Sequence, residues 1–451
     1  MPTPVTFRRA PLATISLAAA VAVAFADSSI VVLALPQLLA EFDTAITPVS
    51  FVITAYNLAV AAVALALAGR LGRARPRTVG TIGLTVFLTA SVGCAFAGTL
   101  AVLIALRCVQ GAGAALLLTG ALPVLVAASG SERRGADAWI TAGAVGAVLG
   151  PALGGALTEA FDWRAIFLAQ APVAALAIPA ALTSGAEPLR ADRARLHRWA
   201  AAANIALGLV FAALVGALFL AVVLLVDIWG LSPLGAAGVV SALPIATILG
   251  SRLERSLAGA RGAAAGAFTL AAGLLGLALL PASSVTLVLA SLLLCGVGLG
   301  LALPFLTRAS LDGGALVSAG ARSIAARHVG LVLALVVVAP VLAAGVEHGA
   351  ERAALGATAE VLDAPVGIAE KVSLALALDR TIDETPRGSM PDIDDAFEGR
   401  EGEGVQQLHD RLVDTLEATL TRSFRTSFGL AALFAALAPI PLVLLRRRSS
   451  T

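Results

Sequence analysis

Long apolar runs separated by short charged stretches dominate the chain. About 20 apolar residues are enough for a helix to cross the hydrocarbon core of a bilayer. The pattern therefore predicts an all-α membrane protein with twelve transmembrane helices. The first run is too long, and lacks the small-residue cleavage pattern, to be a removed signal peptide. The twelve runs have approximate limits 12–36, 47–69, 78–97, 101–127, 138–158, 163–183, 200–226, 231–250, 264–282, 284–307, 327–346 and 426–445.

Positively charged residues are concentrated in every second connection between the apolar runs. Arginines gather before the first run, after every even-numbered run and at the end of the chain. The odd-numbered connections, apart from the eleventh, are short and carry mainly acidic residues, such as Glu41, Asp43 and Asp162. Cytoplasmic loops of membrane proteins carry an excess of Lys and Arg. We therefore expect a multi-pass protein of a bacterial-type plasma membrane, with both termini in the cytoplasm.

The chain divides into two similar halves. Segment 184–199 is charged and is predicted to be a cytoplasmic linker between the N-terminal part, 1–183, and the C-terminal part, 200–451. Gly69-Arg-Leu71 after the second run parallels Gly250-Ser-Arg-Leu253 after the eighth. Internal repeats of this kind are typical of two-domain transporters. The prediction is two pseudo-symmetric bundles of six helices each.

The eleventh connection breaks the pattern. From Glu347 to Arg422 it holds seventeen of the 29 acidic residues of the chain, against seven basic ones. Leucines spaced by four between Val405 and Phe424 predict an amphipathic helix. A weaker helical pattern covers 368–378, and the composition of 379–403 is typical of a mobile segment. We predict an extracytoplasmic acidic insertion at 347–424, which is either a solvated spacer or a binding element.

Composition narrows the function classes. The chain is 59% hydrophobic and only 13% charged, whereas soluble domains are about 25% charged. The sequence has no Gly-rich phosphate loop, metal-ligand spacing or nucleophile triad, so we expect no enzyme, no cofactor and no metal site. Energy should then come from an ion gradient. The expected partners are a small-molecule substrate, protons and the lipid bilayer, without nucleic acid, and the chain is expected to be a monomer.

Two charged residues, Asp27 and Arg107, lie deep inside apolar runs. Asp27 is nine residues before Pro36, which is about 13 Å along a helix and too deep for a short side chain to reach the surface easily. An aspartate at this depth costs at least about 2.5 kcal/mol and usually marks an ion or proton pathway. Arg107 lies at a similar depth in the fourth run, so each is the best partner for the other. The alternatives are an Asp27 side chain that reaches the surface and an Arg107 that binds backbone carbonyls.

Three motifs resemble those of the major facilitator superfamily, and within it the drug:proton antiporters of the fourteen-span branch. Residues 27–36 are similar to its aspartate motif, and residues 107–113 are similar to its Arg-x-x-Gln-Gly-x-Gly motif. The resemblance covers the N-terminal half well and the C-terminal half loosely, and the two extra central spans of that branch are absent. It implies proton coupling through Asp27 and Arg107. The fifth run matches the antiporter motif through Gly146, Gly150, Pro151, Gly154 and Gly155.

The antiporter motif also has a direct physical meaning. Glycines four residues apart leave a bare helix face on which another helix can pack closely. Pro151 removes a backbone hydrogen bond and bends the helix.

The loop after the second run departs from the family pattern Gly-x-Leu-Ala-Asp-Arg-x-Gly-Arg. Here Gly69 begins the run and Arg77 ends it, but Arg73 stands where the aspartate is expected. In the family that aspartate helps to lock the cytoplasmic gate. Glu254 supplies an acid in the pseudo-repeat, and Arg327 resembles an arginine of the fourteen-span branch at the start of the eleventh run. We assign these five residues to gating loops.

The function expected from these features is secondary active export by alternating access. The exporter would exchange protons for small hydrophobic or amphipathic compounds, as multidrug efflux proteins do. Tyr56, Asn57 and Gln110 are polar residues within apolar runs, and they either line the cavity or make hydrogen bonds between helices. Two other classes stay open: an exporter of a lipid or envelope component that uses the long outer loop, and a non-transporting membrane sensor or scaffold.

Overall fold

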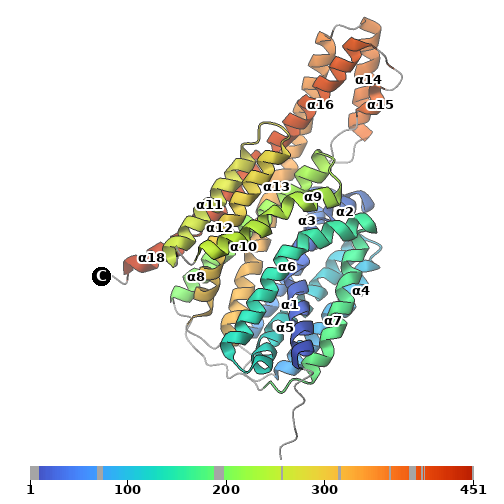
Figure 1. Cartoon of the computed structure of the whole chain (residues 1–451). Helices are drawn as coiled ribbons and strands as arrows, with labels where there is room; N and C mark the ends of the chain where they lie inside the picture. The colour runs from blue at the N-terminus through green and yellow to red at the C-terminus, as the bar shows by residue number, and fades with distance from the viewer. Residues whose placement is uncertain are drawn as a thin grey trace, which may run out of the picture.

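The computed structural model describes residues 10–68, 75–186, 198–254, 257, 259–312, 316–364, 367–384, 393–397, 400 and 402–448. These residues form α-helices and one short π-helix, without a β-strand. Eleven helical segments among them are long and apolar enough to cross a membrane. The predicted all-α membrane fold is therefore confirmed (Figure 1).

The first half consists of six long helices and one short one. Several begin at the cap that the sequence provides, since the side chains of Thr99, Ser131 and Asp162 each accept a hydrogen bond from the first helical turn. Helix α1 packs on α6 and α7, while α5 packs on both α3 and α4. The helices are α1 (Ala10–Val32), α2 (Leu35–Glu41), α3 (Ile46–Ala68), α4 (Pro76–Ala95), α5 (Leu100–Ser129), α6 (Glu132–Ala160) and α7 (Trp163–Leu182).

The second half repeats this arrangement with more breaks in its helices. Helix α12 packs on α8, α10 and α11, and α17 packs on α8 and α11. Its helices are α8 (Arg198–Val223), which continues as the π-helix η2 (Leu224–Ile228), α9 (Pro233–Val240), α10 (Ala242–Leu253), α11 (Ala260–Ala278), α12 (Val285–Leu311), α13 (Leu316–Asp363), α17 (Arg425–Leu437) and α18 (Ile440–Arg448).

Two helix pairs make most of the contact between the halves. Helix α13 packs along α3, and α6 packs on α9. The α6–α9 contact lies at the predicted outer side, where the backbone N–H of Leu234 donates to Glu159 Oε2 over 2.8 Å. The predicted linker 184–199 lies mostly outside the described residues, so the domain boundary there stays a prediction.

Several predicted boundaries are wrong. The eighth and twelfth runs are each divided into two helices, α9–α10 and α17–α18. Helix α13 begins at Leu316, within a stretch expected to be a loop, and continues to Asp363 without a break at 347. The predicted fifth run, 138–158, lies in α6, which is not among the eleven segments that meet the criteria of length and hydropathy. The count of twelve spans is therefore only approximately matched.

A small group of helices projects from the membrane bundle (Figure 1). It consists of the end of α13 with α14 (Ile368–Glu384), α15 (Asp394–Phe397) and α16 (Glu403–Ser423). The predicted amphipathic helix is α16, and the predicted weak helix is α14. The stretch 379–403 was expected to be mobile, but α14 covers its start and α15 part of its middle. The apolar core of this group contains Ala353, Ala357, Val361, Leu374, Leu378, Leu408, Leu412 and Leu416.

Candidate functional site

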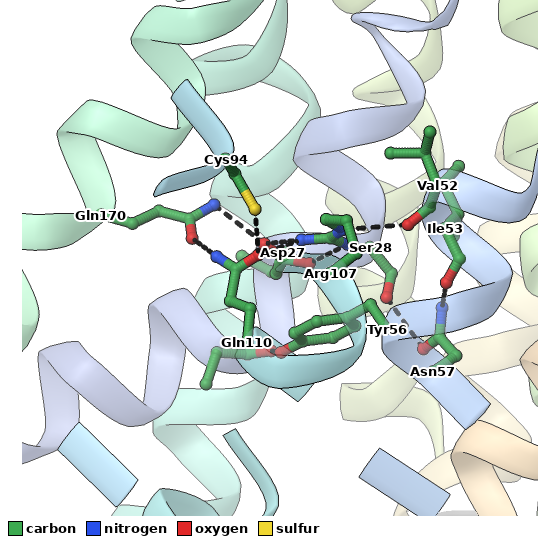
Figure 2. Close-up of polar contacts among 12 residues, drawn as sticks. Asp27, Ser28, Val52, Ile53, Tyr56, Asn57, Cys94, Arg107, Gln110 and Gln170 are labelled. Atoms are coloured by element: carbon green, nitrogen blue, oxygen red, sulfur yellow. Dashed lines mark hydrogen bonds and ion pairs between the residues drawn. The ribbon is translucent and has the colours of Figure 1, made fainter. Parts of the chain in front are cut away.

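Asp27 of α1 and Arg107 of α5 form a fully buried ion pair (Figure 2). Arg107 Nη1 donates to Asp27 Oδ1 over 2.9 Å, and Nη2 donates to Oδ2 over 2.5 Å. This is the two-pronged geometry that a planar guanidinium offers to a carboxylate. The structure thus brings together the two charges that the sequence predicted as partners. Asp27 does not reach the surface, and Arg107 binds a backbone carbonyl in addition to Asp27 rather than in place of it.

Neighbouring groups satisfy most of the remaining hydrogen-bonding capacity of the pair. Arg107 Nε donates to the carbonyl oxygen of Val52 over 2.9 Å, and Nη1 also donates to Gln110 Oε1 over 2.6 Å. Gln170 Nε2 of α7 donates to Asp27 Oδ1 over 2.9 Å. Because a buried pair stabilises a fold only when such additional bonds are made, these contacts explain how the charges are held in the bundle.

Gln110 links the ion pair to two further helices. Its Nε2 donates to Ser91 Oγ of α4 and to Gln170 Oε1 of α7, both over 2.8 Å. The site therefore joins α1, α4, α5 and α7 around a single pair of charges. Any change in the charge of Asp27 would alter hydrogen bonds in each of these helices.

Aromatic rings cover the guanidinium of Arg107. Its Cζ lies 4.3 Å from the ring centroid of Tyr56 and 5.5 Å from that of Phe167. The Tyr56 hydroxyl donates to the carbonyl oxygen of Ala24 over 2.8 Å. Cation–π contacts of this kind add about 0.5–2 kcal/mol each and exclude water from the cation.

A second polar contact joins the two halves beside this site. Ser28 Oγ donates to Asn57 Oδ1 over 3.0 Å, and His328 Nδ1 of α13 lies 2.6 Å from the same oxygen. Asn57 Nδ2 donates to the carbonyl oxygen of Ile53. Tyr56, Asn57 and Gln110 are all fully buried. In this structure their side chains make hydrogen bonds between and within helices, which was the predicted alternative to lining a cavity.

The glycines of the antiporter motif form close helix contacts. A Cβ atom at Gly146 would lie 2.1 Å from the carbonyl oxygen of Ala22 in α1. One at Gly154 would lie 2.6 Å from the carbonyl oxygen of Ile30, also in α1. Gly150 faces α1 as well, and Gly155 faces α9. The bare face therefore allows α6 to contact a helix of each half.

The residues assigned to gating loops do not form one group. Gly69 and Arg73 lie outside the described residues, and Arg77 is exposed in the first turn of α4. Glu254 Oε1 accepts a 2.5 Å ion-pair contact from Arg308 Nη2 of α12. The assignment of Arg327 to a loop is wrong, because α13 begins earlier and places this residue inside the helix.

Sequence reasoning missed three residues of the site: Ser28, Gln170 and His328. Gln170 is the one amide side chain in its apolar run, and a polar residue at membrane depth is itself a signal. Among the described residues, no group of three or more His, Cys, Asp or Glu side chains is arranged to hold a metal ion.

Comparison with known proteins gives partial matches to resistance and efflux proteins. The chain is 35% identical over 164 residues to the methylenomycin A resistance protein of Streptomyces coelicolor, covering 36% of this chain and 34% of that protein. It is 34% identical over 158 residues to the drug efflux pump JefA of Mycobacterium tuberculosis, covering 34% of this chain and 30% of the relative. The chain thus matches about a third of the length of these curated relatives.

The fold matches a solved transporter over nearly the whole chain. A crystal structure of a bacterial homologue of the human lysosomal transporter Spinster, inward-facing and unoccupied, superposes with a TM-score of 0.67 at 15% identity, over 97% of this chain and 98% of that one. At this identity the likeness describes the fold alone. The sequence profile of the Major Facilitator Superfamily matches residues 17–346, so the chain belongs to the Major Facilitator Superfamily.

Proposed function

We propose that the protein exports small hydrophobic or amphipathic compounds in exchange for protons. The observation that supports this most is the buried ion pair of Asp27 and Arg107 in the middle of the first half. A carboxylate at this depth is costly and usually serves an ion or proton pathway. The partial matches to efflux proteins favour export over import.

Proton coupling would work through the hydrogen bonds of Asp27. A proton on Asp27 removes the charge that balances Arg107, and it weakens the bonds from both Arg107 and Gln170. Since these bonds join α1 to α5 and α7, the protonated and unprotonated forms would favour different packing of the first half. Substrate release and proton uptake would then be linked through one conformational equilibrium.

Alternating access requires the contacts between the halves to open on one side at a time. On the predicted outer side, Gly155 packs against Pro233, and Glu159 accepts the hydrogen bond from Leu234. These contacts involve small groups and one exposed hydrogen bond. We propose that they separate when the outer side opens, while α13 and α3 stay packed.

The test is proton-driven efflux by purified Asp27→Asn protein in liposomes. The amide keeps the shape of the side chain but cannot titrate, so we expect uphill transport to be lost while downhill substrate exchange continues. Activity must be counted per folded molecule, because the substitution also leaves Arg107 without its charge partner. Asp137→Asn, at an exposed position, is the matched control. Normal proton-driven transport by the Asp27→Asn protein would contradict the proposal.

A second candidate is export of a lipid or envelope component. It is favoured by large apolar side chains that are exposed on the projecting helices: Leu355 and Leu362 of α13, and Ile368, Val372 and Leu376 of α14. Ile368, Val372 and Leu376 are spaced by four and therefore share one face of α14. An amphiphilic cargo leaving the membrane would find apolar surface there.

Serine substitutions at these exposed positions separate the two candidates. The triple variant Ile368→Ser, Val372→Ser and Leu376→Ser should leave drug efflux unchanged, because the side chains are outside the helical core. Unchanged drug efflux with reduced lipid release would favour the second candidate. Reduced drug efflux would indicate that the projecting helices take part in the first candidate function, export of small compounds.

A further inference from the structure

Arg327 is a second arginine within the bundle, and it has no charge partner in the described part of the chain. It lies in α13, between α1 of the first half and α8 and α12 of the second. Its Nη2 donates to Thr307 Oγ1 over 3.0 Å, whereas its Nε is buried without a hydrogen-bond partner. Its Cζ lies 5.7 Å from the ring of Phe25 and 5.2 Å from that of Phe211.

The contrast with Arg107 shows what is missing at Arg327. Arg107 donates four hydrogen bonds, two of them to a carboxylate. Arg327 donates one, to a neutral hydroxyl. The two cation–π contacts stabilise the guanidinium, but partial removal of a charge from water remains unfavourable unless an opposite charge or several hydrogen bonds compensate for it. Arg327 is half-buried and its Nε is fully buried, so the rings and one hydroxyl leave part of the cost of desolvating the guanidinium uncompensated.

The surroundings of Arg327 combine this unbalanced charge with aromatic surface. Phe25 packs edge-on against Trp139 of α6, with ring centroids 5.0 Å apart. His328, the next residue of α13, has a buried Nε2 without a hydrogen-bond partner. Side chains from both halves thus meet at Arg327, and transporters of this architecture bind substrate between their halves.

We propose that Arg327 binds the anionic group of the transported compound, so that the preferred substrates are organic anions with an aromatic or apolar body. A carboxylate or other oxyanion would accept hydrogen bonds from the guanidinium, including its unused Nε. The apolar body would lie against Phe25 and Phe211. This inference rests on the proposed export function and specifies its substrate class.

The test uses naphthoate and the neutral naphthamide of the same shape as probes of the purified protein in detergent. A ligand that binds only the folded state raises the unfolding temperature. We expect naphthoate to raise it and naphthamide not to. Arg327→Gln should weaken naphthoate binding by at least about tenfold, since a hydrogen bond to a charged group is lost. Arg327→Lys should retain part of the binding, and Arg133→Gln, at an exposed position, should retain all of it.

A further readout separates substrate binding from a structural role. Without ligand, Arg327→Gln should unfold at the same or a higher temperature than the original chain, because it removes a charge that is only partly compensated. A large loss of stability would mean that Arg327 is a structural residue and would overturn the proposal. Equal binding of naphthamide and naphthoate, no binding of naphthoate, or the same stabilisation by chloride alone would overturn it as well.

The naphthoate-binding test and the proton-driven transport test can fail independently of each other. Naphthoate binding in detergent requires no proton gradient, so it tests Arg327 even if proton-driven export is absent. If Arg327-dependent binding is found while Asp27→Asn transports normally, the substrate class stands and the proton mechanism falls. If uphill export requires Asp27 but naphthamide binds as well as naphthoate, the proton mechanism stands and the proposed substrate class is wrong.

Discussion

At the scale of residues, Arg107 and Arg327 lie in the bundle in opposite electrostatic conditions. Arg107 is balanced by Asp27 and is enclosed by amide and aromatic side chains. Among the residues that the structure describes, Arg327 contacts one hydroxyl and two aromatic rings. The charge of Arg107 is balanced as long as Asp27 is ionised, whereas the charge of Arg327 would be stabilised by an anion that reaches it.

Removing both charges of the buried pair should be less harmful than removing one. Arg107→Gln leaves a buried carboxylate and Asp27→Asn leaves a buried guanidinium, and breaking a buried pair in this way costs about 3–5 kcal/mol. In the double variant no charge remains to be desolvated. We therefore expect it to unfold at a higher temperature than either single variant, as measured by thermal unfolding in detergent.

Additive effects would contradict this prediction. If the losses of stability in the two single variants simply sum in the double variant, Asp27 and Arg107 do not interact energetically. Arg133→Gln, at a position exposed to solvent, serves as the control for the loss of one arginine. The double variant should still lack proton-driven transport, because stability and titration are separate properties of the site.

The sequence predicted the charged centre of the site but not its polar surroundings. Asp27 and Arg107 stood out because an ionised side chain in an apolar run requires a partner. Serine and glutamine carry no net charge, and many such residues in membrane helices only bond their own backbone. Ser28 and Gln170 therefore could not be assigned before the helix faces were known. Arg327 was assigned to a gating loop because its helix was predicted to begin there, whereas α13 begins at Leu316.

At the scale of elements, glycines decide how closely α6 approaches its neighbours. A Cβ atom at Gly146 would meet a backbone carbonyl oxygen, which cannot move without shifting α1. At Gly150 the nearest atom would be Ser29 Oγ, which can rotate away. The helix–helix contact therefore depends on Gly146 more strongly than on Gly150.

Gly146→Ala should destabilise the protein by about 1–3 kcal/mol, since extra volume in a well-packed contact forces the backbone apart. Gly238→Ala is the matched control, because its Cβ would meet nothing within 4 Å and it also lies in a helix. We expect the control to be neutral or slightly stabilising, because alanine favours helix more than glycine does. Equal unfolding temperatures for the two variants would contradict the close contact between α6 and α1.

The limits of α13 show why the sequence misplaced some elements. Apolar runs end at charged residues, so Arg322 was counted as part of a loop and Arg327 as the first residue of the eleventh run, although helix formation does not depend on their charge. At the other end, no proline lies between Pro340 and Pro365, and the stretch beyond the membrane is rich in alanine. Alanine is the strongest helix former, so the helix continues past the bilayer. Hydropathy predicts where a chain is apolar, which is a different property from where it is helical.

At the scale of the whole molecule, the acidic helical projection makes the two sides of the membrane unequal. The arginine pattern predicts that α14 and α16 lie outside the cell. A single cysteine at Thr358, which is exposed on α13, should therefore react with an impermeant maleimide in whole cells. A single cysteine at Arg133 should react only after lysis, since Arg133 is exposed in an arginine-rich connection that is predicted to be cytoplasmic.

This labelling requires a chain without its own thiols. Cys94, Cys108 and Cys295 are free, and Cys108 is exposed, so all three are first replaced by alanine. Labelling at Arg133 in intact cells, with none at Thr358, would reverse the predicted topology.

The unbroken course of α13 links the interior of the bundle to the outside mechanically. From Arg327 to Asp363 the helix extends for roughly 54 Å, given a rise of about 1.5 Å per residue. A rod of that length acts as a lever: each degree of tilt about Arg327 displaces its far end by roughly 1 Å. The projecting helices pack on that end, so a small tilt of α13 near Arg327 would displace them by a larger distance. Pro340, the single proline within α13, is where the lever would lose stiffness.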